Sequence, residues 1–358
     1  MPYIIFGMIL AESVVTSDIA KKSKDRFSFV QHDSVCRRIN RFFKSITFDI
    51  YAFFDLIIKY IILNYHLKHL DGKINISFDH MYCKDRFTIL MFTLRIGKQS
   101  VPLWFRCFKG KCDEAAFSED LFKQGIHYCI HLFDHIEKKK IIFTADRFFN
   151  SATLLKFIDS NNCYYCVRLK KNMMVLVYDK KEGHAVWKSI DELTHYVHKP
   201  TYYHNITYTM EHGLQANIVI SKSKDLDEPW YLITNLNPKD AIKTYSKRFG
   251  AIEFFFKSQK SNGFYLESTT ISDLKAFETM YGLCCFAVLF LNIIGVSYCK
   301  NAHGRQYKHV QIEYMQKNKE NKRERTRSNF EIGLILFNKA CYSQVYIYIP
   351  YTFKLYDV

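Results

Sequence analysis

The order of sequence patterns between residues 73 and 171 limits the fold more than any other feature of the chain. Three runs rich in β-branched and aromatic residues come first, separated by short turn-like segments, and they span 73–79, 86–97 and 100–110. Helical patterns then alternate with compact apolar runs, in the order 115–135, 140–146, 151–160 and 163–171. Three strands followed by alternating helices and strands predict an α/β fold, with a mixed sheet flanked by helices.

Two aspartates stand at the ends of predicted strands in this region. Asp79 closes the first run, and Asp146 closes the fourth. If these two strands are neighbours in the sheet, both carboxylates lie at the same end of it. The order of the elements permits this arrangement without requiring it.

A third carboxylate lies in the stretch 245–263, YSKRFGAIEFFFKSQKSNG. As one helix, this stretch places Glu253, Lys257 and Lys260 on a shared polar face beside an apolar one. Arg248 falls off that polar face if the helix is unbroken. The simpler alternative is a solvated basic face on which Glu253 pairs with Lys257 four residues later.

The charge of the chain narrows the class of partner. Lys and Arg number 51 against 35 for Asp and Glu, so the net charge is +16, and the pI is about 9.2. Such an excess indicates a polyanionic partner, with nucleic acid ahead of an anionic membrane. The 11 cysteines are scattered and odd in number. This usage is typical of reduced thiols in a cytoplasmic protein rather than of a disulfide framework.

The first 70 residues are expected to form a helical DNA-binding domain. Within them, the segment SVCRRINRFFKS carries Arg37, Arg38 and Arg41 around apolar positions, and a shorter helical pattern precedes it. Two short helices of this kind resemble a helix-turn-helix reader of DNA. An amphipathic helix with a solvated basic face explains the pattern equally well.

The rest of the chain divides by composition. We expect an α/β core built from 71–171 and 229–299, interrupted by a β-rich insertion at 172–228. Within the core, 279–299 is a run of 21 residues without a charge, which is long enough to cross a bilayer. Because it contains asparagine and glycine and follows a charged segment, we expect a buried core helix and no membrane contact. Residues 300–358 form a basic C-terminal region with a strand-like tail.

Three carboxylates from separate elements, surrounded by Lys and Arg, suit phosphoryl transfer assisted by two metal ions. Carboxylate oxygens are ligands for hard cations, so Mg²⁺ is the expected ion. The alternative at this level is that each aspartate simply ends a strand.

Four motifs carry a resemblance to a known family. They are ISFDHMY around Asp79, IGKQSVPLWF, FTADRFFNSATLL around Asp146, and YSKRFGAIEFFFKSQKSNGF around Glu253. Over about residues 70–300 the chain resembles the DDE transposases of bacterial insertion sequences, in the Tyr-Arg-Glu-Lys signature group (the insertion sequence 4 family). The resemblance implies a ribonuclease H-like core that is interrupted by a β-rich insertion before the glutamate helix.

The resemblance also implies roles for single residues. Asp79, Asp146 and Glu253 would be catalytic and would bind two Mg²⁺ ions, with Mn²⁺ as a substitute. The DNA phosphates near the cut would be bound by Tyr245, Arg248 and Lys260. The implied partners are the terminal inverted repeats and target DNA, held by a homodimer in the synaptic complex. The implied reaction is cut-and-paste transposition through a hairpin intermediate.

Two further observations leave alternatives open. Trp230 and Phe249 are candidates for stacking an unpaired base, although both also fit a core position. The family usually has three residues between the signature Arg and Glu, whereas four separate Arg248 from Glu253. The alternatives are therefore a ribonuclease H-like nuclease without strand transfer, or a catalytically inactive DNA-binding relic of a transposase.

Overall fold

The structure is a computed structural model of the chain. It describes residues 1–23, 30–63, 73–96, 99–111, 118–179, 181–222, 228–261, 263–301, 312–313, 315–317 and 323–343. The predicted boundary at residue 70 and the predicted strand-like tail lie outside these residues.

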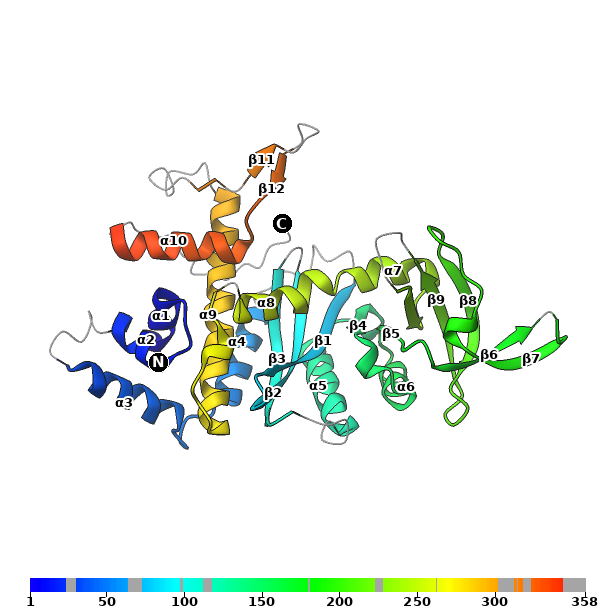
Figure 1. Ribbon diagram of the computed structural model, residues 1–358, viewed down its shortest axis with the longest axis horizontal. Coiled ribbons are helices and arrows are strands. Elements are labelled where there is room, and N and C mark those ends of the chain that lie inside the picture. The colour runs from blue at the N-terminus through cyan, green and yellow to red at the C-terminus, as the bar shows by residue number, and fades with distance from the viewer. Residues whose placement is uncertain are drawn as a thin grey trace.

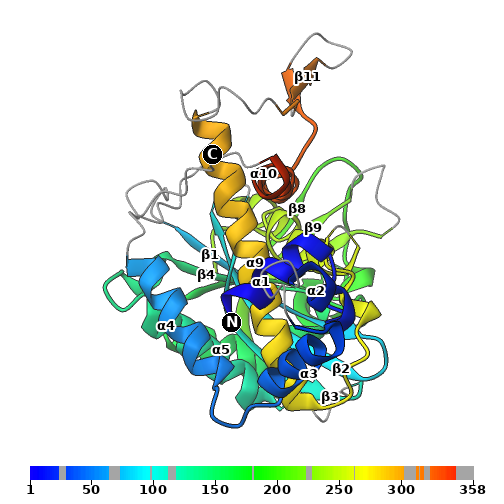
Figure 2. The ribbon, with the colours of Figure 1, turned by 90° about the vertical axis from the view of Figure 1, so that its left-hand side faces the viewer.

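Helices from both ends of the chain gather around one long central helix, α9 (Leu274–Asn301). The N-terminal helices are α1 (Pro2–Ala11), α2 (Thr16–Ser23), α3 (His32–Phe43) and α4 (Ile50–Leu63). Figures 1 and 2 show these helices around α9, and α1, α3 and α4 contact it directly. By length and composition α9 could cross a membrane, as could the bent pair α1 and α2 if it counted as one span. The most apolar window of α9 is 89% buried in the protein, which is what a core helix requires.

A second helix, α10 (Asn329–Ser343), crosses α9 closely. A Cβ atom on Gly295 of α9 would lie 1.9 Å from the carbonyl oxygen of Asn329, and one on Gly333 would lie 1.9 Å from that of Leu291. Only glycine permits backbones to approach in this way. The crossing therefore fixes the start of α10 beside the C-terminal part of α9. The sequence reasoning had no helix here, in the region it described only as basic.

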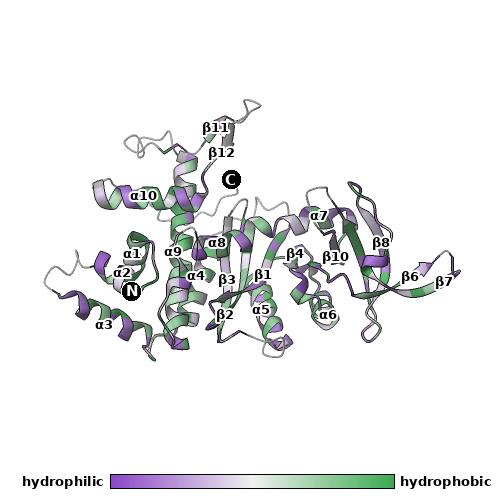
Figure 3. Ribbon diagram, in the orientation of Figure 1, coloured by the Kyte–Doolittle hydropathy of each residue, from purple (hydrophilic) through white to green (hydrophobic). Residues whose placement is uncertain are grey.

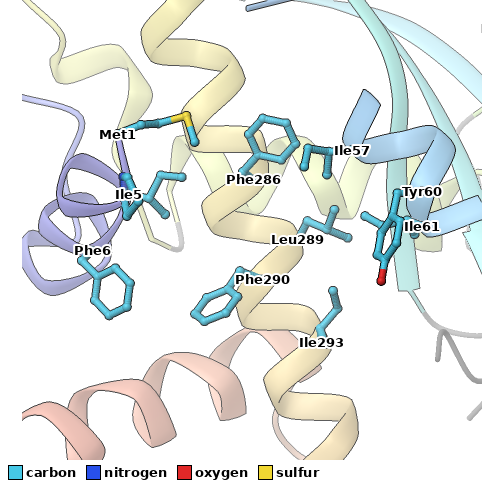
Figure 4. A pocket seen from close by; sticks show the side chains of 11 residues that line it. Met1, Ile5, Phe6, Ile57, Tyr60, Ile61, Phe286, Leu289, Phe290 and Ile293 are labelled. Atoms are coloured by element: carbon cyan, nitrogen blue, oxygen red, sulfur yellow. The ribbon is translucent and has the colours of Figure 1, made fainter. Parts of the chain in front are cut away.

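The helical part of the molecule contains an apolar cavity of about 350 Å³ between α1, α4 and α9. Figure 4 shows the side chains around it, which include Ile5, Phe6, Ile57, Tyr60, Phe286, Leu289 and Phe290.

The strands form one ten-stranded mixed sheet in the order β3-β2-β1-β4-β5-β10-β9-β8-β6-β7. Its first five strands are β1 (Ile74–Cys83), β2 (Phe87–Ile96), β3 (Gln99–Lys109), β4 (Ile141–Ala145) and β5 (Tyr164–Arg168). The others are β6 (Met174–Asp179), β7 (His184–Ser189), β8 (Thr201–Tyr208), β9 (Leu214–Ser221) and β10 (Trp230–Thr234). The mixed α/β sheet predicted from the sequence is confirmed. The strands of 172–228 extend this same sheet through the pairing of β9 with β10.

Helices cover both faces of the sheet. On one face, α5 (Glu119–Leu132) and α6 (Ala152–Ser160) pack against β3 and β5. On the other, α7 (Pro238–Ser246) covers a separate apolar cluster, to which β4, β5, β9 and β10 each contribute. Figure 1 shows α7 and α8 above the strands and α5 and α6 below them. Outside the sheet, β11 (Met315–Lys317) and β12 (Arg323–Arg325) form a short hairpin before α10.

One predicted strand end is wrong. Strand β1 does not end at Asp79 but continues to Cys83. Its second half pairs with β2, in antiparallel register from Asp79 opposite Met91 to Cys83 opposite Phe87. The parallel pairing with β4, however, stops at Phe78 opposite Ala145. Asp79 therefore lies inside a strand and also at the end of the parallel pair.

Candidate active site

The pairing of β1 with β4 brings Asp79 and Asp146 to the same end of the sheet. Because Phe78 pairs with Ala145 in parallel register, the next residue on each chain is an aspartate. Both point to the face opposite Phe78, since side chains alternate along a strand. Two residues earlier on that face, the hydroxyls of Ser77 and Thr144 hydrogen-bond at 2.7 Å. The predicted meeting of the two aspartates thus follows from strand register.

The stretch that carries Glu253 is helical, but it is not one regular helix. Asn237 caps α7, its side chain accepting a hydrogen bond from the Lys239 amide at 3.1 Å. The chain then passes through a π-helix (Phe249–Glu253) into α8 (Phe254–Lys260). A π-turn contains about one residue more than an α-turn, because its hydrogen bonds join residues five apart, so it can accommodate a single-residue insertion. The condition under which Arg248 would leave the polar face, one unbroken helix, is therefore not met.

The π-helix brings Glu253 back beside Arg248, although one extra residue separates them in the sequence. In an α-helix each residue turns by about 100°, so residues five apart lie on different faces. Here Arg248 and Glu253 are five apart and lie side by side, with the arginine Nη1 2.6 Å from the glutamate Oε1. Glu253 thus pairs with Arg248, in contrast to the simpler expectation of a pair with Lys257.

Arg248 is the centre of the site. Its side chain is only 4% exposed, and its two Nη groups bridge the carboxylates of Asp79 and Glu253. The neighbouring Tyr245 is also buried, and its hydroxyl donates to Asp146 Oδ1 at 3.4 Å. These side-chain contacts form two sets, Arg248 with Asp79 and Glu253, and Tyr245 with Asp146. The two sets adjoin because the Arg248 amide donates to the Tyr245 carbonyl oxygen at 2.9 Å.

Burial dominates the electrostatics of this network. Desolvation raises the pKa of Asp79 from 3.8 to about 6, against the lowering effect of Arg248, and Asp146 and Glu253 add to the increase. Burial lowers the pKa of Arg248, but Asp79 and the other anionic neighbours raise it by more. The net result is a raised pKa. Desolvation lowers the pKa of His80, the residue after Asp79. The site holds more negative charge than one arginine balances.

The ligand types present fit a hard divalent cation. Asp79 and Glu253 both pair with Arg248, Asp146 follows the strand beside that of Asp79, and carboxylate oxygens are the donors that Mg²⁺ prefers. Across the described part of the chain, however, no three acidic, His or Cys side chains are grouped so that they could hold a metal ion as they stand. Arg248 instead supplies the countercharge between Asp79 and Glu253. Metal binding at these residues would therefore require the arginine to give up at least one of its carboxylates.

The raised pKa of Asp79 gives a testable pH dependence. The folded protein binds this proton more tightly than the unfolded chain does, so the resulting stability is complete below pH 3.8 and is lost as the pH rises to about 6. We expect the metal-free wild type to lose on the order of 2–3 kcal/mol relative to Asp79→Asn across this window. Denaturant unfolding of both proteins at several pH values measures the difference. A difference that does not change with pH would contradict the assignment.

The remaining predicted site residues lie further out. Lys260 ends α8, and its Nζ is 3.1 Å from Glu267 Oε1. Arg37, Arg38 and Arg41 are exposed on α3, which Figure 1 places on the far side of α9 from the sheet. Figure 3 shows their helix as a mixture of hydrophilic and hydrophobic residues. The structure does not bring these three arginines to the carboxylates.

Three aromatic rings form a cluster around Tyr245, whose hydroxyl donates to Asp146. The rings of Trp230 and Phe249 are stacked, with centroids 5.4 Å apart, and Tyr245 meets the Trp230 ring edge-on at 5.2 Å. Phe249 is 40% exposed, so its ring is open to solvent on one side.

Sequence reasoning missed Arg95 on β2. Its Nη1 donates to the carbonyl oxygen of Lys247 at 2.5 Å, immediately before Arg248. A Cβ atom on Gly250 would lie 3.1 Å from the same nitrogen, so glycine lets the arginine approach the π-helix closely. The basic residue in β2 carried no signal of this role, but the extra residue before Glu253 was a usable sign of the π-turn.

The comparison with protein families identifies the class. The family model described as transposase DDE domain matches residues 97–290, which is more than half of the chain. The chain belongs to this family of DDE transposases. The matched range contains Asp146 and Glu253 and begins after Asp79.

Similar solved structures are distant. One is a piggyBac transposase synaptic complex with hairpin DNA, at 12% identity and a TM-score of 0.47, covering 94% of this chain and 69% of that one. Another is Ciona intestinalis endonuclease V in complex with a 23mer DNA, at 10% identity and a TM-score of 0.25, covering 54% of this chain and 86% of that one. No curated protein matches the chain.

Proposed function

We propose that the chain is a transposase that cuts DNA at the ends of an insertion sequence and joins those ends to target DNA. The observation that carries the proposal is the convergence of Asp79, Asp146 and Glu253 around Arg248 in a chain of the DDE family. Within the proposal, the catalytic core is ribonuclease H-like, and the signature residues assign the enzyme to the Tyr-Arg-Glu-Lys group. The enzyme acts as a homodimer on paired DNA ends.

The three carboxylates would hold the metal ions and thereby orient the phosphodiester that reacts. When bound, two Mg²⁺ ions would activate the attacking oxygen and stabilise the leaving oxygen at one phosphodiester. Asp79 and Asp146 are held on rigid neighbouring strands, and Tyr245 orients the Asp146 carboxylate by its hydrogen bond. Arg248, once released from a carboxylate, is placed to bind a phosphate of the cut strand, because guanidinium groups match phosphate geometry well.

A hairpin intermediate requires the DNA to bend tightly, which unstacks a base. The exposed face of Phe249 offers a surface for that base, and Trp230 supports the ring from behind. Both residues adjoin Tyr245, whose hydroxyl donates to Asp146. We include the hairpin in the proposal because these stacked rings offer a surface for an unstacked base.

The test is a cleavage assay on the DNA that borders the gene. A labelled duplex carrying that DNA is incubated with the protein and Mg²⁺, and the products are resolved under denaturing conditions. We expect nicked, hairpin and joined products. If the wild type gives only nicks, the protein is a nuclease without strand transfer. If it binds the duplex but never cuts it, the inactive relic is the better description.

Lys260 distinguishes nicking from the later steps. It lies seven residues after Glu253, about 10.5 Å along a helix at about 1.5 Å per residue, and can reach a neighbouring phosphate. Poor positioning of a cut end can cost about a hundredfold. We expect Lys260→Ala to nick at nearly the wild-type rate but to lose about that factor in hairpin formation and joining.

The control for Lys260→Ala is Glu267→Gln, which breaks the ion pair between these residues but keeps the cation. If Glu267→Gln shows the same loss, the ion pair matters rather than a contact between Lys260 and DNA.

A further inference from the structure

Beside the carboxylate site lies a second site, which is basic, in a cavity of about 470 Å³ between the π-helix, α8 and the start of α10. Four cationic side chains line it: Arg95, Lys257, Arg325 and Arg327. We propose that this cavity binds a backbone phosphate of the DNA strand that passes the carboxylates. The proposal rests on the proposed function for the identity of the DNA, but the site can be measured without any cleavage.

The wall shared with the carboxylate site is the helix that carries Glu253. Lys257 is exposed and lies one turn beyond Glu253, and Gly250 of the π-helix also lines the cavity. Arg95 reaches the same wall through its hydrogen bond to the Lys247 carbonyl. A strand bound at Glu253 therefore has a basic surface directly beside it.

The opposite wall is the segment from β12 into α10. Arg325 is fixed there, since its Nη2 donates to Asn329 Oδ1 and contacts Cys299 Sγ. Its buried Nε–H has no acceptor among the described residues. Buried donors are almost always satisfied by a partner, water or ligand, so this guanidinium is suited to a further acceptor.

The charge of the cavity favours an anion. The one acidic residue among the described lining residues is Glu331, and its Oε2 accepts hydrogen bonds from the amide (2.7 Å) and hydroxyl (2.9 Å) of Ser328. Glu331 is thereby engaged in capping α10, whose N-terminal end carries a partial positive charge. Arginine and lysine together with a helix start are typical partners of a phosphate.

The test compares two double variants of the full-length protein. Lys257→Gln with Arg327→Gln removes two cations from the cavity, both from exposed side chains. Lys138→Gln with Lys140→Gln removes two exposed cations before β4, at the opposite end of this strand from Asp146. The probe is a fluorescein-labelled duplex of arbitrary sequence, in EDTA, with affinity measured by anisotropy between about 50 and 200 mM salt.

The expected result is a shallower salt dependence for the cavity variant alone. Each phosphate contact contributes about 0.9 to the slope of log K against log salt, so loss of the one phosphate held in the cavity should lower the slope by about 0.9. The control should keep the wild-type slope, and Lys257→Gln by itself should lose about half as much as the cavity double variant. Equal slopes for the cavity variant and the wild type, with both folded by thermal melting, would overturn the proposal.

A titration with inorganic pyrophosphate separates DNA from a free anion. If pyrophosphate binds the wild type and not the cavity variant while the DNA slopes are equal, the cavity is a free-anion site and the proposal falls. The cavity proposal and the proposed catalytic function can be rejected independently of each other. A wild type that cleaves DNA with no slope difference rejects only the cavity, and a wild type that never cleaves but shows the slope difference rejects only the catalytic role.

Discussion

Cleavage of DNA in Mg²⁺ is expected to fall by about a thousandfold or more when Asp79, Asp146 or Glu253 is replaced by its amide. Each amide keeps the shape of the side chain but removes the negative charge that a divalent cation needs. Metal ions contribute several kcal/mol to the stabilisation of such a transition state, and about 1.4 kcal/mol corresponds to a factor of ten in rate. The three losses should be similar, because the carboxylates act as one unit.

The measurement is the rate of nicking of an end-containing duplex, together with its affinity for the protein in EDTA. Affinity should be unchanged or slightly higher, since each change removes a negative charge near the phosphates. Asp240→Asn is the matched control, because Asp240 is exposed on α7 and pairs only loosely with Lys73 at 3.3 Å. An amide variant that still cleaves at the wild-type rate would remove that residue from the catalytic set.

The second large effect concerns stability. Replacing Arg248 by methionine is expected to destabilise the metal-free protein by about 3–5 kcal/mol, because the change leaves a buried carboxylate without its counter-ion. Asp79, which is 17% exposed, bears most of this cost, whereas Glu253 at 43% is better hydrated. Adding Asp79→Asn to the Arg248→Met variant should recover much of the loss, since the uncompensated charge is then gone.

Denaturant unfolding of the wild type, both single variants and the double variant measures this coupling. Arg147→Ala serves as the control. Arg147 is 49% exposed and pairs with the exposed Glu228 at 3.4 Å, so its loss should cost less than about 1 kcal/mol. If Arg248→Met unfolds like the wild type, the ion pairs of Arg248 do not support the fold. Mg²⁺ should also stabilise Arg248→Met more than the wild type, because in the variant Mg²⁺ no longer competes with Arg248 for the carboxylates.

Much of the catalytic region was predictable because its local patterns agree with its tertiary structure. The order of strands and helices from 73 to 171 follows from alternation and apolar runs, and the convergence of Asp79 with Asp146 needs only their parallel register. The predicted first strand was too short, because pairing with β2, rather than the sequence pattern of β1, extends the strand to Cys83. Helix α10 was missed in the sequence. Its apolar stretch is accounted for by the crossing with α9, and that crossing is a long-range contact.

The three carboxylates, Tyr245 and Arg248 were named from the sequence, but their geometry was not predictable. No spacing rule for an α-helix places Arg248 beside Glu253, and no sequence pattern indicated that the arginine would bridge two carboxylates. Arg95 contacts Lys247, which is 152 residues later in the chain. The cavity beside α10 also includes residues from Arg325 onward, so both features depend on distant segments that meet only in the folded protein. Such contacts are set by packing, which leaves little trace in any single stretch of sequence.

The π-helix between Arg248 and Glu253 also affects how relatives of this chain should be aligned. A search pattern with a fixed interval would compare Ile252 with the glutamate of other family members, or Phe249 with their arginine, and would score the chain as damaged. An alignment with a one-residue gap inside the π-turn pairs both functional side chains correctly. The additional residue is therefore a change in spacing that the helix absorbs within one turn, and it gives no ground for classing the chain as a degenerate copy.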